Sequence, residues 1–237
     1  MTGSRRPSRF FCLDFFFCLR YPCAMHLFLL LSFPLCLAIW ILRSEGRRAP
    51  CVFNAFLGIL LAAVFCAYKY FFAPYYFLTP DSFFRNFIHV FFEQILLPLG
   101  VLTAAFLFVF KKDKISDRVE GLFPFYAGFY AVFLPFRILQ DNLPNSAFGL
   151  FAKPILFILT LLVLSECEKS LFVPSQRAML DKLDAFSVWS SFVLALIFPA
   201  GFEALWVLGM NAFVTILLLG LYSAGTVLFL KKRLSQK

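Results

Sequence analysis

Charged residues and histidine are both scarce in this 237-residue chain. Asp, Glu, Lys and Arg make up 15% of the residues, and there are two histidines. A soluble protein of this length needs a larger charged surface, and two histidines cannot supply a multi-histidine metal site. The chain also contains no glycine-rich phosphate loop, no HExxH and no GxSxG. We therefore expect no metal site, no cofactor and no catalytic residues of these classes.

The seven cysteines form no CxxC pair and have no partnering cluster of histidines. Six of them lie in the first 66 residues, and Cys36 and Cys66 fall within apolar runs. A small, soft side chain packs well inside a helical protein without any chemical role. We interpret the cysteines as packing residues and assign no disulfide.

Apolar side chains, in contrast, are abundant: they make up 62% of the residues, and 36 of them are Phe. Lipid accepts such a surface directly, whereas water does not. The net charge of +9 is carried by Lys and Arg in short segments between apolar runs. That placement is typical of membrane topology and not of nucleic-acid binding. The sequence predicts an integral membrane protein that is surrounded by a lipid bilayer and binds no nucleic acid.

The apolar residues fall into runs long enough to cross a membrane. The first five runs cover residues 27–42, 50–72, 87–110, 121–139 and 148–164. Residues 185–230 are too many for one span of roughly 20 residues, so we divide them into two helices. The turn between these helices lies at 199–201 or at 209–211, and we favour the first. We predict an all-α, polytopic integral membrane helical bundle with about seven transmembrane helices.

Basic and nearly neutral loops alternate along the chain. Residues 43–48, 111–118, 169–182 and 231–237 hold three, four, three and four Lys or Arg. The intervening loops, 73–86, 140–147 and 201–211, hold only Arg85. Because basic loops stay in the cytoplasm, we expect a cytoplasmic C-terminus and an external N-terminus, in the cytoplasmic (inner) membrane of a bacterium.

The first 24 residues contradict this orientation, because they carry four Arg and one Asp. Their apolar stretch, residues 10–18, is too short to cross a membrane and contains Asp14. Either they form a basic leader, or translation begins at Met25, which would lower the net charge from +9 to +6. We therefore divide the chain into a leader (1–24), a single transmembrane domain (25–230) and a basic tail (231–237).

Ionisable residues gather near the predicted outer ends of the helices. Thr79 is expected to cap a helix that begins at Pro80. Four ionisable side chains then recur at every fourth position on one stripe of this helix: Asp81, Arg85, His89 and Glu93, followed by Gln94. Others are expected at the same level of the membrane: Lys69, Arg137, Asp141, Lys153 and Glu203. The stripe and its neighbours thus bring acids and bases together.

Two interpretations of these charges remain open. The acids and bases can pair and simply hold the helix ends together. Alternatively, because a charge deep in a membrane helix costs roughly 2.5–3.5 kcal/mol, they line a water-filled pocket that faces outward. A pocket with both signs of charge suits a zwitterion or another small polar solute. The candidate ligand-binding residues are Asp81, Arg85, His89, Glu93, Gln94, Arg137, Asp141, Lys153 and Glu203.

The sequence therefore predicts recognition or transport of a small polar or zwitterionic solute, with other membrane subunits as potential partners. One alternative is a structural or assembly component of a membrane complex. A second alternative is a lipid-modifying intramembrane enzyme, in which His89 and Glu93 act as an acid–base pair. We rank the enzyme last because no nucleophile accompanies that pair.

Overall fold

The computed structural model describes residues 23–44, 48–72, 78, 80–109, 121–140, 147–172 and 182–234. Throughout these residues the regular structure is helical and contains no strand, which confirms the all-α prediction. Six rods are single helices: α2 (Cys23–Arg43), α3 (Arg48–Phe72), α7 (Leu122–Gln140), α8 (Ala147–Phe172), α10 (Lys182–Val207) and α11 (Ala212–Leu234). A seventh rod is composite and consists of α4 (Phe83–Val90), the π-helix η2 (Phe91–Leu96) and α5 (Leu97–Val109).

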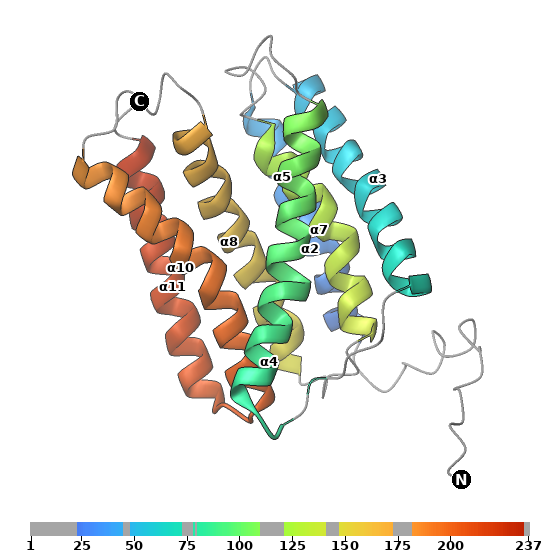
Figure 1. Cartoon of the computed structure of the whole chain (residues 1–237), viewed down its shortest axis with the longest axis vertical. Helices are drawn as coiled ribbons and strands as arrows, with labels where there is room; N and C mark the ends of the chain where they lie inside the picture. Colours follow the sequence, from blue (N-terminus) through green and yellow to red (C-terminus); the bar gives the residue numbers. More distant parts are fainter. Residues whose placement is uncertain are drawn as a thin grey trace.

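The seven rods run alternately in opposite directions (Figure 1). The helix ends that carry Arg43, Arg48 and Lys231 lie together at one end of the bundle. We call this the basic end. The last turn of α3 and the first turn of α4 lie at the opposite end, which we call the site end. The alternating charge of the predicted loops thus corresponds to two different ends of one bundle.

Four of the described helices are long and apolar enough to cross a membrane: Arg48–Phe72, Phe83–Phe106, Asp184–Val207 and Ala212–Arg233. Their outer faces carry large apolar side chains, among them Phe72, Phe84 and Phe213, each more than 70% exposed. Such faces are unfavourable in water and favourable in lipid. Together, the helix lengths and the exposed apolar faces identify a membrane protein.

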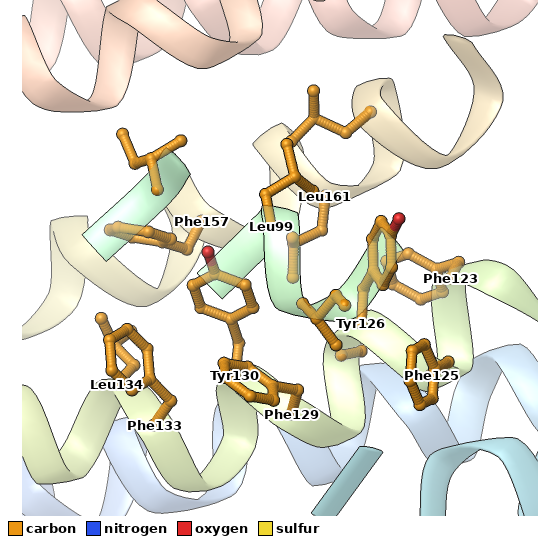
Figure 2. Packing of buried hydrophobic residues seen from close by; sticks show 14 of the residues in the cluster. Leu99, Phe123, Phe125, Tyr126, Phe129, Tyr130, Phe133, Leu134, Phe157 and Leu161 are labelled. Atoms are coloured by element: carbon orange, nitrogen blue, oxygen red, sulfur yellow. The ribbon is translucent and has the colours of Figure 1, made fainter. Parts of the chain in front are cut away.

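Helix α7 forms the centre of the bundle and packs against α2, α3 and α8. Tyr126 and Tyr130 point from α7 toward α5 and α8 (Figure 2), and Phe129 and Phe133 both pack against Phe65 of α3. The four rings of α7 are at most 2% exposed. This aromatic core explains part of the high Phe content, since the rings fill the space between three helices.

The contact between α3 and α7 depends on two glycines. A Cβ atom at Gly58 would lie 2.1 Å from the carbonyl oxygen of Phe125, and one at Gly128 would lie 2.2 Å from that of Ala55. Each glycine therefore allows the backbone of the other helix to approach. Small residues at such positions are typical of helix pairs in membranes, where close packing replaces the hydrophobic effect as the driving force.

The favoured position of the last turn, residues 199–201, was wrong. Pro199 lies inside α10, which continues to Val207, and the chain reverses at residues 208–211. Gly209 has φ +88° there, a conformation that favours glycine. The alternative position at 209–211 was therefore the correct one. As a result, Glu203 lies within a helix and not in a loop.

Other helix boundaries also differ from the prediction. The helix expected to begin at Pro80 begins at Phe83, and Ser82 is its N-cap, with its hydroxyl accepting from the Arg85 backbone N–H at 3.4 Å. Thr79 lies outside the described residues. The fifth helix, predicted over 148–164, continues to Phe172. This extension places several polar residues inside the bundle at the basic end.

Candidate functional site

The most buried polar group at the site end consists of Lys153, Glu203 and Gln94, which come from α8, α10 and η2. Lys153 Nζ lies 2.6 Å from Glu203 Oε1, and Gln94 Nε2 donates to the same oxygen at 3.2 Å. The three residues are 6%, 2% and 0% exposed. We call them the central triad. Three rods far apart in sequence therefore meet at one carboxylate.

The second carboxylate oxygen of Glu203 is not matched in the same way. Glu203 Oε2 is buried and accepts no hydrogen bond from the part of the chain that the structure describes. A buried acceptor without a donor costs about 1–3 kcal/mol. Lys153 has three N–H donors, and its contact with Glu203 uses one of them. The triad thus combines a carboxylate oxygen that accepts no hydrogen bond, Glu203 Oε2, with N–H donors of Lys153 that this contact does not use.

Two further pairs of polar side chains lie at the site end, each joining a buried base to a partly exposed residue. Lys69 of α3 forms an ion pair with Glu93 of η2, whose side chain is 33% exposed. Arg137 of α7 is 5% exposed, and its Nη2 donates to Nε2 of His89 at 3.2 Å. A guanidinium has no acceptor, so His89 Nε2 accepts in this contact and carries no proton. Together with the triad, acids and bases from five rods thus lie at one end of the bundle.

The π-helix positions two of these side chains. In α-helical geometry Pro98 would donate to the carbonyl of Gln94, but proline has no N–H. The Tyr130 hydroxyl donates to that carbonyl instead, at 2.9 Å. Segments of π-helix occur frequently at functional sites, because the wider turn presents side chains that an α-helix would not. Here it places Glu93 toward Lys69 and Gln94 toward Glu203.

The predicted residues divide into those that meet at the site end and those that do not. The structure brings together His89, Glu93, Gln94, Arg137, Lys153 and Glu203, along with Lys69. Asp81 lies in the turn before α4 and Arg85 in the first turn of α4, and both are exposed. Asp141 lies outside the described residues. The charged stripe is also broken, because Asp81 precedes the helix and Glu93 lies in the π-helix.

Sequence reasoning missed a second buried polar group, located toward the basic end. The Tyr126 hydroxyl lies 2.5 Å from Glu168 Oε2 and 3.3 Å from Thr103 Oγ1. Glu168 is 4% exposed and forms no ion pair with any described residue. The only signal in the sequence was the polar run 165–170, which directly follows an apolar one.

No group of three or more His, Cys, Asp or Glu side chains among the described residues is arranged to hold a metal ion. Four cysteines are described as free thiols: Cys36, Cys51, Cys66 and Cys167, of which the last three are buried. No protein-family model, no curated protein and no solved structure matches this chain. Conclusions about its function therefore rest on the geometry of the central triad and its surroundings.

Proposed function

We propose that this chain is a multi-pass protein of a cytoplasmic membrane, that all seven rods cross it, and that the basic end is cytoplasmic. Four rods have the required length and hydropathy. The others pack antiparallel among them within one bundle. The positive-inside rule then favours a cytoplasmic position for Arg43, Arg48 and the basic end of α11. In this orientation the central triad lies buried in the outer half of the bundle.

In that setting the triad is suited to recognising or transporting a small zwitterionic solute. The observation that carries this proposal is the buried Oε2 atom of Glu203, which accepts no hydrogen bond from the described residues and lies beside the Lys153 ammonium group. The cationic group of a zwitterion would pair with Oε2, and its anionic group would accept from Lys153. Charged side chains within membrane helices most often mark a substrate or ion pathway.

A second candidate, a structural or assembly role, has an observation of its own. Lys69 and Lys153 are already paired with Glu93 and Glu203, so both lysines are neutralised without a ligand. Ion pairs of this kind can fix the relative positions of α3, α8, α10 and η2. The protein would then present its surface to other membrane subunits and bind no solute.

The test is thermal unfolding of the detergent-purified chain with a panel of zwitterionic amino acids and betaines, and with neutral polyols of similar size. A solute at 100 times its dissociation constant should stabilise the protein by about 2.7 kcal/mol. Glu203→Gln should abolish the response, because the amide keeps the size of the side chain and loses its charge. Glu166→Gln is the matched control, since Glu166 pairs with Lys169 near the other end of α8.

If no zwitterion stabilises the wild-type chain, or if Glu203→Gln responds as Glu166→Gln does, the solute site is wrong and the structural role is favoured. The variant that combines Lys153→Gln with Glu203→Gln keeps charge balance, so it guards against a simple folding defect. Uptake of a stabilising solute into proteoliposomes then distinguishes transport from recognition.

A further inference from the structure

Of the glutamates in the described helices, all but Glu168 have a lysine partner. The pairs are Glu93 with Lys69, Glu203 with Lys153 at 2.6 Å, and Glu166 with Lys169 at 2.9 Å. Glu168 of α8 is 4% exposed, yet it forms no ion pair with any Lys, Arg or His among the described residues. A buried carboxylate without a cation is strongly unfavourable, and such a group takes up a proton instead.

The groups that surround the Glu168 carboxyl suit its neutral form. The Tyr126 hydroxyl donates to Glu168 Oε2 at 2.5 Å and lies 3.3 Å from Thr103 Oγ1. A tyrosine hydroxyl has one proton, so Tyr126 accepts from Thr103 in the second contact. Two uncharged hydroxyls thus form a chain from α5 through α7 to α8, and this chain brings a donor to Oε2. The proton of the acid itself therefore belongs on Oε1.

Other titratable and charged side chains lie at this end of α8 and of the helices packed against it. They are Arg43 of α2, Tyr126 of α7, Glu166, Cys167 and Lys169 of α8, Asp184 of α10, and Lys231, Lys232 and Arg233 of α11. Arg233 donates to the Ser170 hydroxyl, and Lys232 pairs with Asp184 at 2.8 Å. In the described part of the chain, the tyrosine is the member of this set that forms a hydrogen bond with the Glu168 carboxyl.

We propose that Glu168 is a proton-binding site, whose carboxyl holds a proton on Oε1 at neutral pH and exchanges it with water at the basic end. Binding adds one proton to the carboxylate and breaks no other bond. Glu168 precedes the end of α8 at Phe172 by one helical turn, roughly 6 Å along the axis, so the path to water is short. Ionisable side chains within membrane helices often mark proton pathways.

This site is separate from the central triad. Lys153 and Glu168 both belong to α8, but they lie roughly 22 Å apart along the helix axis. The proton site therefore does not depend on the proposed solute, and its test needs no ligand.

The first test is infrared difference spectroscopy of the full chain in detergent micelles at neutral pH, recorded in ordinary and in heavy water. A protonated carboxyl has a C=O stretching band that moves to lower frequency in heavy water. We expect this band in the wild type and in Glu166→Gln, and we expect Glu168→Gln to lack it. Glu166→Gln is the matched control, because Glu166 lies on the same helix and has a lysine partner. Glu168→Asp keeps a carboxyl but shortens the side chain, so it should change the frequency of the band even if the glutamine variant fails to fold.

The second test is thermal unfolding of the same variants between about pH 6 and 8, where an exposed glutamate is ionised. The native chain keeps the Glu168 proton and the unfolded chain releases it, so rising pH should destabilise the wild type relative to Glu168→Gln. The unfolding equilibrium constant should rise up to about tenfold per pH unit in this comparison. Glu166→Gln should follow the wild type.

A wild-type spectrum without the band, or a band that persists unchanged in Glu168→Gln or Glu168→Asp, would overturn the proton site. A band that does not move in heavy water would overturn the exchange with water. The same dependence of stability on pH in the wild type and in Glu168→Gln would show that Glu168 is ionised in the native chain and balanced by a cation, which also excludes the proposal.

Discussion

Replacing Gly58 or Gly128 by alanine should force α3 and α7 apart. The added Cβ would lie 2.1 Å or 2.2 Å from a carbonyl oxygen, whereas ordinary contact begins at about 3.4 Å. The shortfall is about 1.2–1.3 Å, and the opposing atoms belong to helix backbone, so no side-chain rotation relieves it. The helices must therefore move, together with the rings of Phe65 and Phe129 that pack between them at 5.6 Å.

Overpacking of this kind costs about 1–3 kcal/mol. Alanine itself favours the helix over glycine by roughly 0.5–1 kcal/mol, which offsets part of the loss. Gly100→Ala and Gly201→Ala are matched controls, because a Cβ at either position meets nothing within 4 Å. The controls should gain stability and the interface variants should lose it, so the two classes differ in sign.

Unfolding in mixed detergent micelles, followed by circular dichroism, measures these differences. The variant with both Gly58→Ala and Gly128→Ala should lose less than the sum of the single losses, because one separation of the helices relieves both clashes. If Gly58→Ala proves as stable as Gly201→Ala, the close approach of α3 and α7 does not exist. Strictly additive losses would mean that the two glycines act at independent contacts.

Three further predictions concern the polar groups and the orientation. Lys153→Met should lower the free energy of unfolding by about 3–5 kcal/mol, because it leaves Glu203 buried without a cation, and adding Glu203→Met should recover most of this loss. If each single variant is as stable as the wild type, water reaches the site. Tyr126→Phe should lower the free energy of unfolding by about 1–3 kcal/mol, because it removes the donor to Glu168. In the same unfolding assay Tyr68→Phe, at a 57% exposed position, should leave stability unchanged. Equal losses of stability in the two variants would contradict the buried hydrogen bond. In intact cells that express a variant without the native cysteines, a cysteine introduced at Asn145 should react with a membrane-impermeant thiol reagent, while cysteines at Ser116 and Ser175 should not. The reverse labelling pattern would overturn the orientation.

Helix positions were predictable from the sequence because long apolar runs have few other solutions in a membrane. The position of the last turn was not predictable, since residues 199–201 and 209–211 both contain a glycine, and residues 199–201 also contain a proline. Proline usually ends a helix, but membrane-type helices tolerate it because neighbouring helices satisfy the backbone groups it frees. Pro199 follows that exception, and Gly209, with its positive φ, makes the turn.

The members of the charged site were largely predictable, and their partners were not. Spacing along a chain shows which residues share a helix face, so Glu93 was expected beside His89. The structure pairs Glu93 with Lys69 and His89 with Arg137, because α3 and α7 bring those cations from elsewhere in the sequence. Glu168 was missed for a related reason: a polar run at the end of an apolar one resembles a loop until its burial is known.

The π-helix has a consequence for how this chain tolerates changes in length. Buried positions along the composite rod are single before η2, at Asn86 and Val90, and come in adjacent pairs across η2 and the start of α5, at Gln94 with Ile95 and at Pro98 with Leu99. A π-helical turn of this kind absorbs one extra residue locally, so the helices on either side keep their faces. We expect that deleting one residue within 91–96 restores an α-helix while α4 and α5 remain packed. Deleting one residue from α5 instead would rotate everything beyond it by about 100°. The polar site can thus be lost by shortening the chain at a point where the scaffold survives, which makes site and fold separable.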